Sequence, residues 1–139
     1  MKEKSEMQKE TTKEFSPDDV ITALLAFLPQ EFNNDPETIH TTIRKLQTRK
    51  KYKDLLDGFE FLDYSRFPYS PLLARILNRL QESRLLASRN PEYVVYLIKP
   101  DSQKAIESYF LGEGKILHEQ RSKLKDMATE LAKKLEDVR

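Results

Sequence analysis

Residues 93–98 form an unbroken apolar run between Pro91 and Pro100. Six consecutive residues rich in valine and tyrosine, bounded by prolines, predict a β-strand. The strand needs a partner for its backbone groups, and residues 85–88 are the nearest candidate, so the sequence predicts a β-hairpin. Because the run does not alternate with polar residues, both faces of the strand are expected to be covered, by the C-terminal helix or by a second subunit.

Three amphipathic helices are predicted before this hairpin. Each begins with a residue that can cap a helix, followed by a proline at the first helical position. The three pairs are Ser16 and Pro17, Asp35 and Pro36, and Ser70 and Pro71. Pro29 is expected to end the first helix and Gly58 the second.

The chain after the hairpin is predicted to form a short helix at residues 102–111 and a long charged helix at residues 115–138. Leu117, Leu124 and Leu131 fall seven residues apart on the long helix. Such a stripe either packs back on the domain or pairs with its copy in a homodimer, although Gln120 and Lys134 interrupt a coiled-coil pattern. These three leucines are the candidate dimerisation residues.

This order of elements predicts a mainly α fold, a winged helix-turn-helix with a small β-hairpin and a long C-terminal helix. The 139 residues suit a single domain. We expect a disordered or frayed tail at residues 1–15, because this segment has few apolar groups to offset its ordering entropy. The winged-helix domain is expected at residues 16–111, and the C-terminal helix, for packing or dimerisation, at residues 112–139.

The amino-acid composition indicates the cellular compartment of the protein. The chain has no cysteine, which fits a reducing environment. No apolar run approaches the ~18 residues of a membrane span, and the charged N-terminus lacks the apolar segment of a secretory signal. These features predict a cytoplasmic protein that does not contact membranes.

Motifs for catalysis or metal binding are incomplete. Thiolate metal sites are excluded by the absence of cysteine. His118 and Glu119 begin a zinc-protease motif, but Ser122 stands where the second histidine would be. His40 is interpreted as a surface or half-buried residue. The sequence therefore predicts no enzyme activity, no metal and no cofactor.

The polar side of the third helix carries Arg75, Asn78 and Arg79. Arginine reads guanine and asparagine reads adenine in a major groove, and a helix-turn-helix inserts the first half of this helix most deeply. Arg84 and Arg89 lie toward the hairpin, where a wing would meet phosphates. These five residues are candidate DNA contacts, and the alternative is an ordinary solvated helix face.

A second basic feature is the stretch of residues 44–53. The whole chain has a formal net charge of only +1, so attraction to nucleic acid must come from local clusters. In this stretch Arg49, Lys50 and Lys51 are candidate contacts to DNA phosphates. The alternative is again solvated surface.

An aromatic stretch followed by Pro-Tyr-Ser, a leucine-rich helix and a hairpin spans residues 59–98. The residues that carry this pattern are Phe59, Phe61, Tyr64, Pro68, Tyr69, Ser70, Leu73, Leu77, Leu80, Leu85 and Leu86. The pattern resembles the Panacea-type proteins, a phage-associated, antitoxin-like winged-helix family, although Phe67 stands where that family has glycine. The resemblance implies an adaptor or antitoxin role as readily as DNA binding.

Two functions thus remain open from the sequence. The first is a DNA-binding transcriptional regulator, expected to be a homodimer on double-stranded DNA. The second is a protein-interaction module that binds a protein partner and no nucleic acid. An open, positive face on the third helix would favour DNA, whereas a face covered by the C-terminal helix would favour a protein partner.

Overall fold

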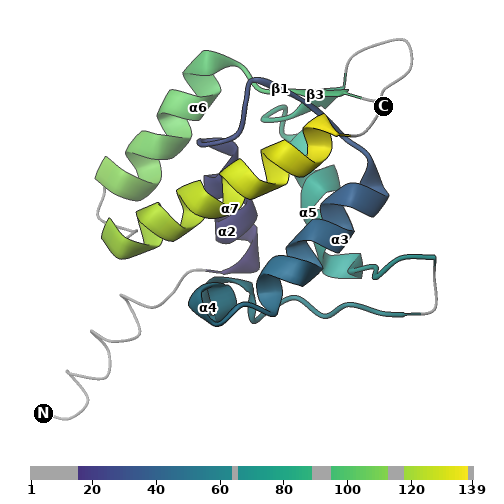
Figure 1. The fold of residues 1–139 in the computed structure, drawn as a ribbon. Coiled ribbons are helices and arrows are strands. Elements are labelled where there is room, and N and C mark those ends of the chain that lie inside the picture. The colour runs from purple at the N-terminus through teal and green to yellow at the C-terminus, as the bar shows by residue number, and fades with distance from the viewer. Residues whose placement is uncertain (1–15, 64–65, 89–94, 113–117, 138–139) are drawn as a thin grey trace, which may run out of the picture.

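The computed structural model describes residues 16–63, 66–88, 95–112 and 118–137. Within these residues the fold is mainly helical with a small three-stranded antiparallel sheet (Figure 1). In chain order the elements are α2 (Pro17–Leu25), β1 (Glu31–Asn33), α3 (Pro36–Gln47), the 3-10 turn η1 (Lys50–Tyr52), α4 (Lys53–Leu56), α5 (Pro71–Glu82), β2 (Ala87–Ser88), β3 (Val95–Leu97), α6 (Pro100–Glu107), the π-helical turn η2 (Ser108–Gly112) and α7 (His118–Glu136). The expected tail at residues 1–15 lies outside the described residues.

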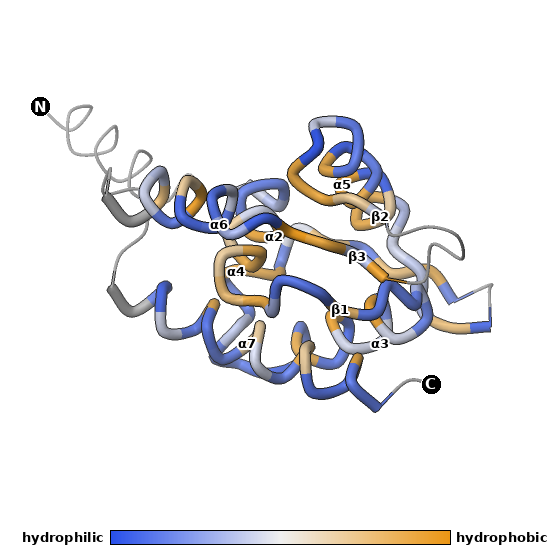
Figure 2. The backbone as a smooth tube through the Cα atoms, turned by 90° about the horizontal axis from the view of Figure 1, so that it is seen from above, coloured by the Kyte–Doolittle hydropathy of each residue, from blue (hydrophilic) through white to orange (hydrophobic). Residues whose placement is uncertain are grey.

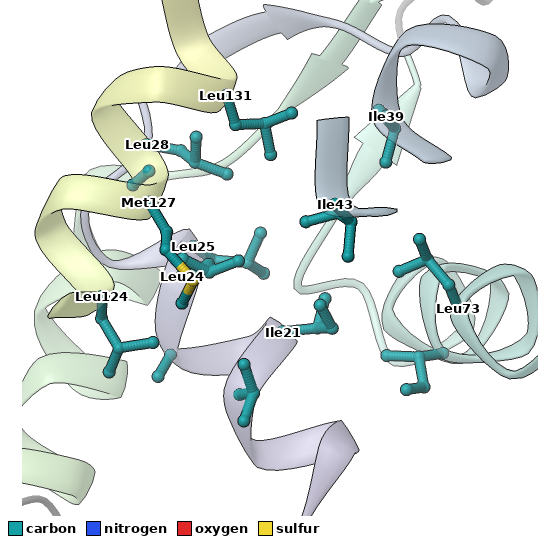
Figure 3. Packing of buried hydrophobic residues seen from close by; sticks show 14 of the residues in the cluster. Ile21, Leu24, Leu25, Leu28, Ile39, Ile43, Leu73, Leu124, Met127 and Leu131 are labelled. Carbon is teal, nitrogen blue, oxygen red and sulfur yellow. The ribbon is translucent and has the colours of Figure 1, made fainter. Parts of the chain in front are cut away.

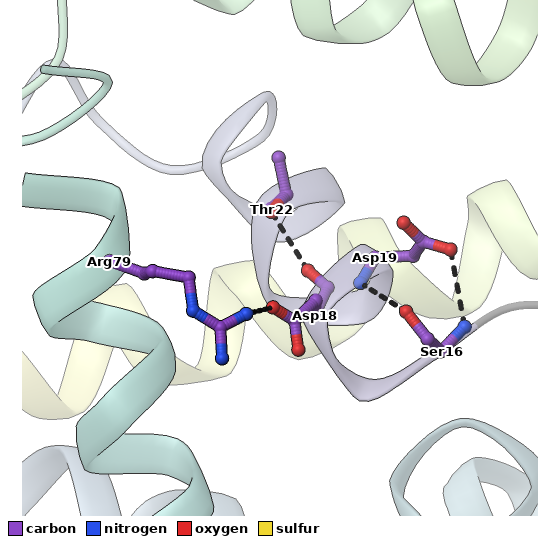
Figure 4. A network of polar contacts seen from close by, with 5 residues as sticks. All are labelled: Ser16, Asp18, Asp19, Thr22 and Arg79. Carbon is purple, nitrogen blue, oxygen red and sulfur yellow. Dashed lines mark hydrogen bonds and ion pairs between the residues drawn. The ribbon is translucent and has the colours of Figure 1, made fainter. Parts of the chain in front are cut away.

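The first three long helices begin where the capping signals predicted. The Ser16 hydroxyl accepts a hydrogen bond from the Asp19 N–H, and the Asp19 carboxylate accepts one from the Ser16 N–H (Figure 4). This reciprocal pair satisfies two backbone donors at the start of α2. Asp35 and Ser70 cap α3 and α5 by accepting from the backbone N–H three residues later. The predicted starts of these helices are therefore confirmed.

Strand β3 is the centre of the sheet, whose order is β1-β3-β2. Tyr96 pairs with Ser88 on one side and with Phe32 on the other, both antiparallel. The pairing of β2 with β3 confirms the predicted hairpin, and positions 93–94 of the predicted strand lie outside the described residues. Strand β1 was not predicted, because Glu31–Asn33 is short and takes its extended form from its partner, as tertiary pairing overrides weak local preference.

Helix α7 packs back onto the rest of the chain. Leu124, Met127 and Leu131 are buried and meet Leu24 and Leu28 from α2 and the turn after it (Figure 3). The leucine stripe was expected either to pack on the domain or to pair with its copy in a homodimer. At these positions the structure shows packing within the chain. Their burial contributes about 1.5–3 kcal/mol per side chain to the core.

Two helical segments differ in detail from the sequence expectation. The second predicted helix does not continue to Gly58: α3 ends at Gln47, the backbone is extended at Arg49, and η1 and α4 follow as separate helical turns. The short helix begins at Pro100, two residues earlier than predicted, because proline is well suited to the first helical position. After Glu107 this helix continues as the wider turn η2.

Candidate functional site

The exposed face of α5 is the first candidate. Leu73, Ile76 and Leu80 are buried on one side of the helix, whereas Arg75 and Asn78 are exposed on the other. Neither exposed side chain makes a hydrogen bond or ion pair with another residue in the described ranges. Both are therefore able to meet a ligand without breaking a hydrogen bond or ion pair to a described residue.

The C-terminal helix leaves this face open. Helix α7 packs against α2, α3 and β1. Figure 1 shows α7 in front of α2 and α5 to the right of α2, and in Figure 2 α5 and α7 lie on opposite sides of α2. A ligand as large as a duplex could approach α5 without displacing α7.

Arg79 differs from its two neighbours on α5. Its guanidinium donates a hydrogen bond to the Asp18 carboxylate in the first turn of α2 (Figure 4). The two side chains are 51% and 40% exposed, so this is a surface ion pair that a competing anion can reach. Arg79 is thus at the border of the open face, partly neutralised by α2.

Two side chains of the basic stretch at residues 44–53 form ion pairs with α7. Arg49 donates two hydrogen bonds, of 2.8 and 2.7 Å, to the two carboxylate oxygens of Glu130. These bonds lower the pKa of Glu130 and raise that of Arg49. Lys51 Nζ lies 3.7 Å from Asp126, also on α7, and only Lys50 among the three predicted contacts has no such partner within the described ranges.

These ion pairs bear on whether the basic cluster of Arg49, Lys50 and Lys51 can contact DNA. The carboxylates of α7 already neutralise Arg49 and Lys51, and α7 lies on the far side of the molecule from α5. The structure therefore does not bring the cluster and the α5 residues together on one surface. A groove of about 560 Å³ between η1 and α7 is lined by charges of both signs, including Lys133 and Asp137.

Arg84 lies at the other end of α5, where the helix turns into β2. Its φ is 70°, in the left-handed region that favours glycine. The Arg84 N–H bonds the Gln81 carbonyl, and the Leu85 N–H bonds the Leu80 carbonyl, each at 3.0 Å. This pair of bonds is the Schellman arrangement that ends many helices. Arg89, the other predicted wing residue, lies outside the described residues.

The prediction that His40 is a surface or half-buried residue is wrong. His40 is buried, with 2% of its surface exposed. Its Nδ1 accepts a hydrogen bond of 3.0 Å from the Ser70 N–H, and its ring stacks on Tyr69 at 4.9 Å. Burial lowers the pKa of His40 from 6.5 to about 4, so the ring is neutral at pH 7.

The contacts of His40 place it beneath the start of α5, where it fixes the backbone of the capping residue Ser70. One sequence signal could have indicated its burial. His40 lies three residues before Ile43 and seven before Gln47, so it falls on the same side of α3 as two residues that contact the interior.

Leu124 and Leu131, the predicted dimerisation residues, are 0% and 4% exposed within the single chain. A homodimer seam would therefore need another surface or the release of α7. Leu117 lies outside the described residues. The described ranges also contain no group of three His, Asp or Glu side chains placed to hold a metal ion.

Within the same ranges, no helix has the length and apolar character needed to cross a bilayer. Comparison of the chain with protein-family models, with curated proteins and with solved structures found no match.

Proposed function

We propose that this protein is a winged helix-turn-helix that binds double-stranded DNA through the exposed face of α5. The order of elements supports this fold: a helix, a strand, two long helices and a hairpin, with the first strand paired to the last. In such a domain α5 is the recognition helix, and the hairpin of β2 and β3 is the wing.

The observation that carries the proposal is the open face of α5. Arg75 and Asn78 are exposed, have no internal partner in the described ranges, and are not covered by α7. An arginine can form two hydrogen bonds with guanine, and an asparagine two with adenine. Ser70 caps the helix, so Arg75 is its fifth residue and Asn78 its eighth, and the N-terminal part of a recognition helix is the part that enters a major groove.

The ion pairs separate the candidate contacts by role. Arg75 and Asn78 are the proposed base contacts, and Arg79 can join them by exchanging Asp18 for a base or a phosphate. Arg49 is held by Glu130, and Lys51 lies beside α7 on the far side of the molecule from α5, so the proposal does not use them as phosphate contacts. A bound duplex would therefore lie along α5 and away from η1.

A protein-interaction role is the second candidate, and one observation favours it. A groove of about 860 Å³ between α7 and β1 is lined by apolar residues that include Phe27, Phe32 and Leu135, interspersed with polar and charged ones such as Glu31 and Lys133. The resemblance to antitoxin-like Panacea-type proteins fits this role as well as it fits DNA binding. The groove lies on the α7 side of the molecule, so the two roles would use different surfaces.

The test is a titration of the full chain against random-sequence duplexes, followed by selection of a preferred site. At ~50 mM salt, a helix-turn-helix with a few phosphate contacts should bind in about the micromolar range. Arg75→Ala should cost about 1–3 kcal/mol on the preferred site and reduce the preference between sites, because a base contact is lost.

Lys125→Ala is the matched control, since it removes an equally exposed charge from α7. It should leave both the affinity and the site preference unchanged. Absence of binding by the unmodified chain at this salt concentration would contradict the proposal and favour the protein-partner role.

A further inference from the structure

The connection between α4 and α5 forms a projection whose two arms run antiparallel. Leu62 and Tyr69 exchange both backbone hydrogen bonds, at 2.8 and 3.0 Å. Figure 1 shows the arms extending from the body of the molecule at the lower right, directly before the first turn of α5. We refer to residues 62–63 and 66–69 as the α5 projection.

The base of the α5 projection is fastened to α3. The His40 ring stacks on Tyr69 with an interplanar angle of 10° and lies 5.8 Å from the Phe67 ring. The same ring accepts the Ser70 N–H, which joins the projection to the cap of α5. The backbone at the base of this arm is therefore held in place relative to the recognition helix of the proposed function.

Arg66 is the cation that the α5 projection presents. Its side chain is 85% exposed, and its ion pair with Glu37 is long, at 3.9 Å, with a partner that is itself 57% exposed. Such a pair contributes little and is readily exchanged for another anion. A phosphate would satisfy the guanidinium better, because two parallel hydrogen bonds can form.

From this placement we infer that Arg66 is a contact to the DNA backbone beside the N-terminus of α5. The inference depends on the proposed function, since it adds a second contact to the same bound duplex. The part of α5 that enters the groove begins next to the projection, so the flanking phosphates pass close to it. Asp63 and Glu37 are the exposed carboxylates nearby that oppose this contact.

Four variants of the full chain test the inference on the random-sequence duplex. Arg66→Ala should weaken binding about ten-fold at ~50 mM salt and lower the slope of log affinity against log salt by about one. Arg66→Lys, which keeps the charge, should retain most of the affinity. Glu37→Gln should raise the affinity, because it removes a repelling carboxylate. Lys125→Ala should leave the slope unchanged.

The outcomes distinguish a failure of the inference about Arg66 from a failure of the proposed function. If the unmodified chain does not bind the duplex, the proposed function itself is contradicted. If it binds and Arg75→Ala weakens binding to the preferred site, but Arg66→Ala behaves like Lys125→Ala, the inference about Arg66 is overturned while the proposed function stands. The melting temperature of Arg66→Ala should equal that of the unmodified chain, which excludes loss of folding as the cause.

Discussion

His40 is the residue whose chemistry depends most on its surroundings. Its pKa falls from 6.5 to about 4 on folding, because burial disfavours the charged ring. The unfolded chain therefore binds a proton between these two values and the folded chain does not. Stability is complete above pH 6.5 and falls as the pH is lowered, by about 3 kcal/mol on reaching pH 4.

Urea unfolding at pH 7 and pH 5 measures this effect. The free energy of unfolding should decrease by about 2 kcal/mol between these conditions. His118→Gln is the control, because it removes the other histidine and should leave the decrease intact. His40→Gln should abolish most of the decrease. If most of the decrease in the free energy of unfolding remains in this variant, other groups cause it.

Arg84 gives a second prediction at the residue scale. Its left-handed backbone is strained for any residue with a Cβ, and glycine relieves the strain. Arg84→Gly should therefore raise the free energy of unfolding by about 0.5–1 kcal/mol. The matched control is Ser83→Gly, one residue earlier at φ −84°, which should lower it. A loss of stability in Arg84→Gly would contradict this account.

Helix α7 is the element that closes the core. Leu124 is fully buried within the chain, so Leu124→Ala should lower the free energy of unfolding by about 2–5 kcal/mol. The mass measured by light scattering should not change, because the side chain has intramolecular neighbours. The adjacent Lys125→Ala should alter neither quantity, and a fall in mass for Leu124→Ala would instead place this leucine between subunits.

Elements with local signals could be predicted from the sequence. Ser70 and Pro71 mark the start of α5 because the cap and the first turn are adjacent in the chain. The apolar run at residues 93–98 predicted β3 because its residues are consecutive in the chain. Strand β1 has no such signal, since Phe32 is extended only because it pairs with the distant Tyr96.

At the scale of the whole molecule, the candidate site was only partly predictable. The exposure of Arg75 and Asn78 follows from helical periodicity, which the sequence contains. The pairing of Arg49 with Glu130 joins residues 81 positions apart and depends on how α7 packs. Sequence patterns therefore identified the basic cluster, but they could not show that the chain itself neutralises part of it.

Because α7 contributes to the core, the core can be completed only after α7 has been synthesised. During synthesis α2 emerges before α7, yet its apolar side is covered by Leu124, Met127 and Leu131 from that later helix. Until that helix is made, a growing chain exposes this surface to whatever is nearby. Nascent chains that stall before α7 are therefore expected to be bound by chaperones or to aggregate.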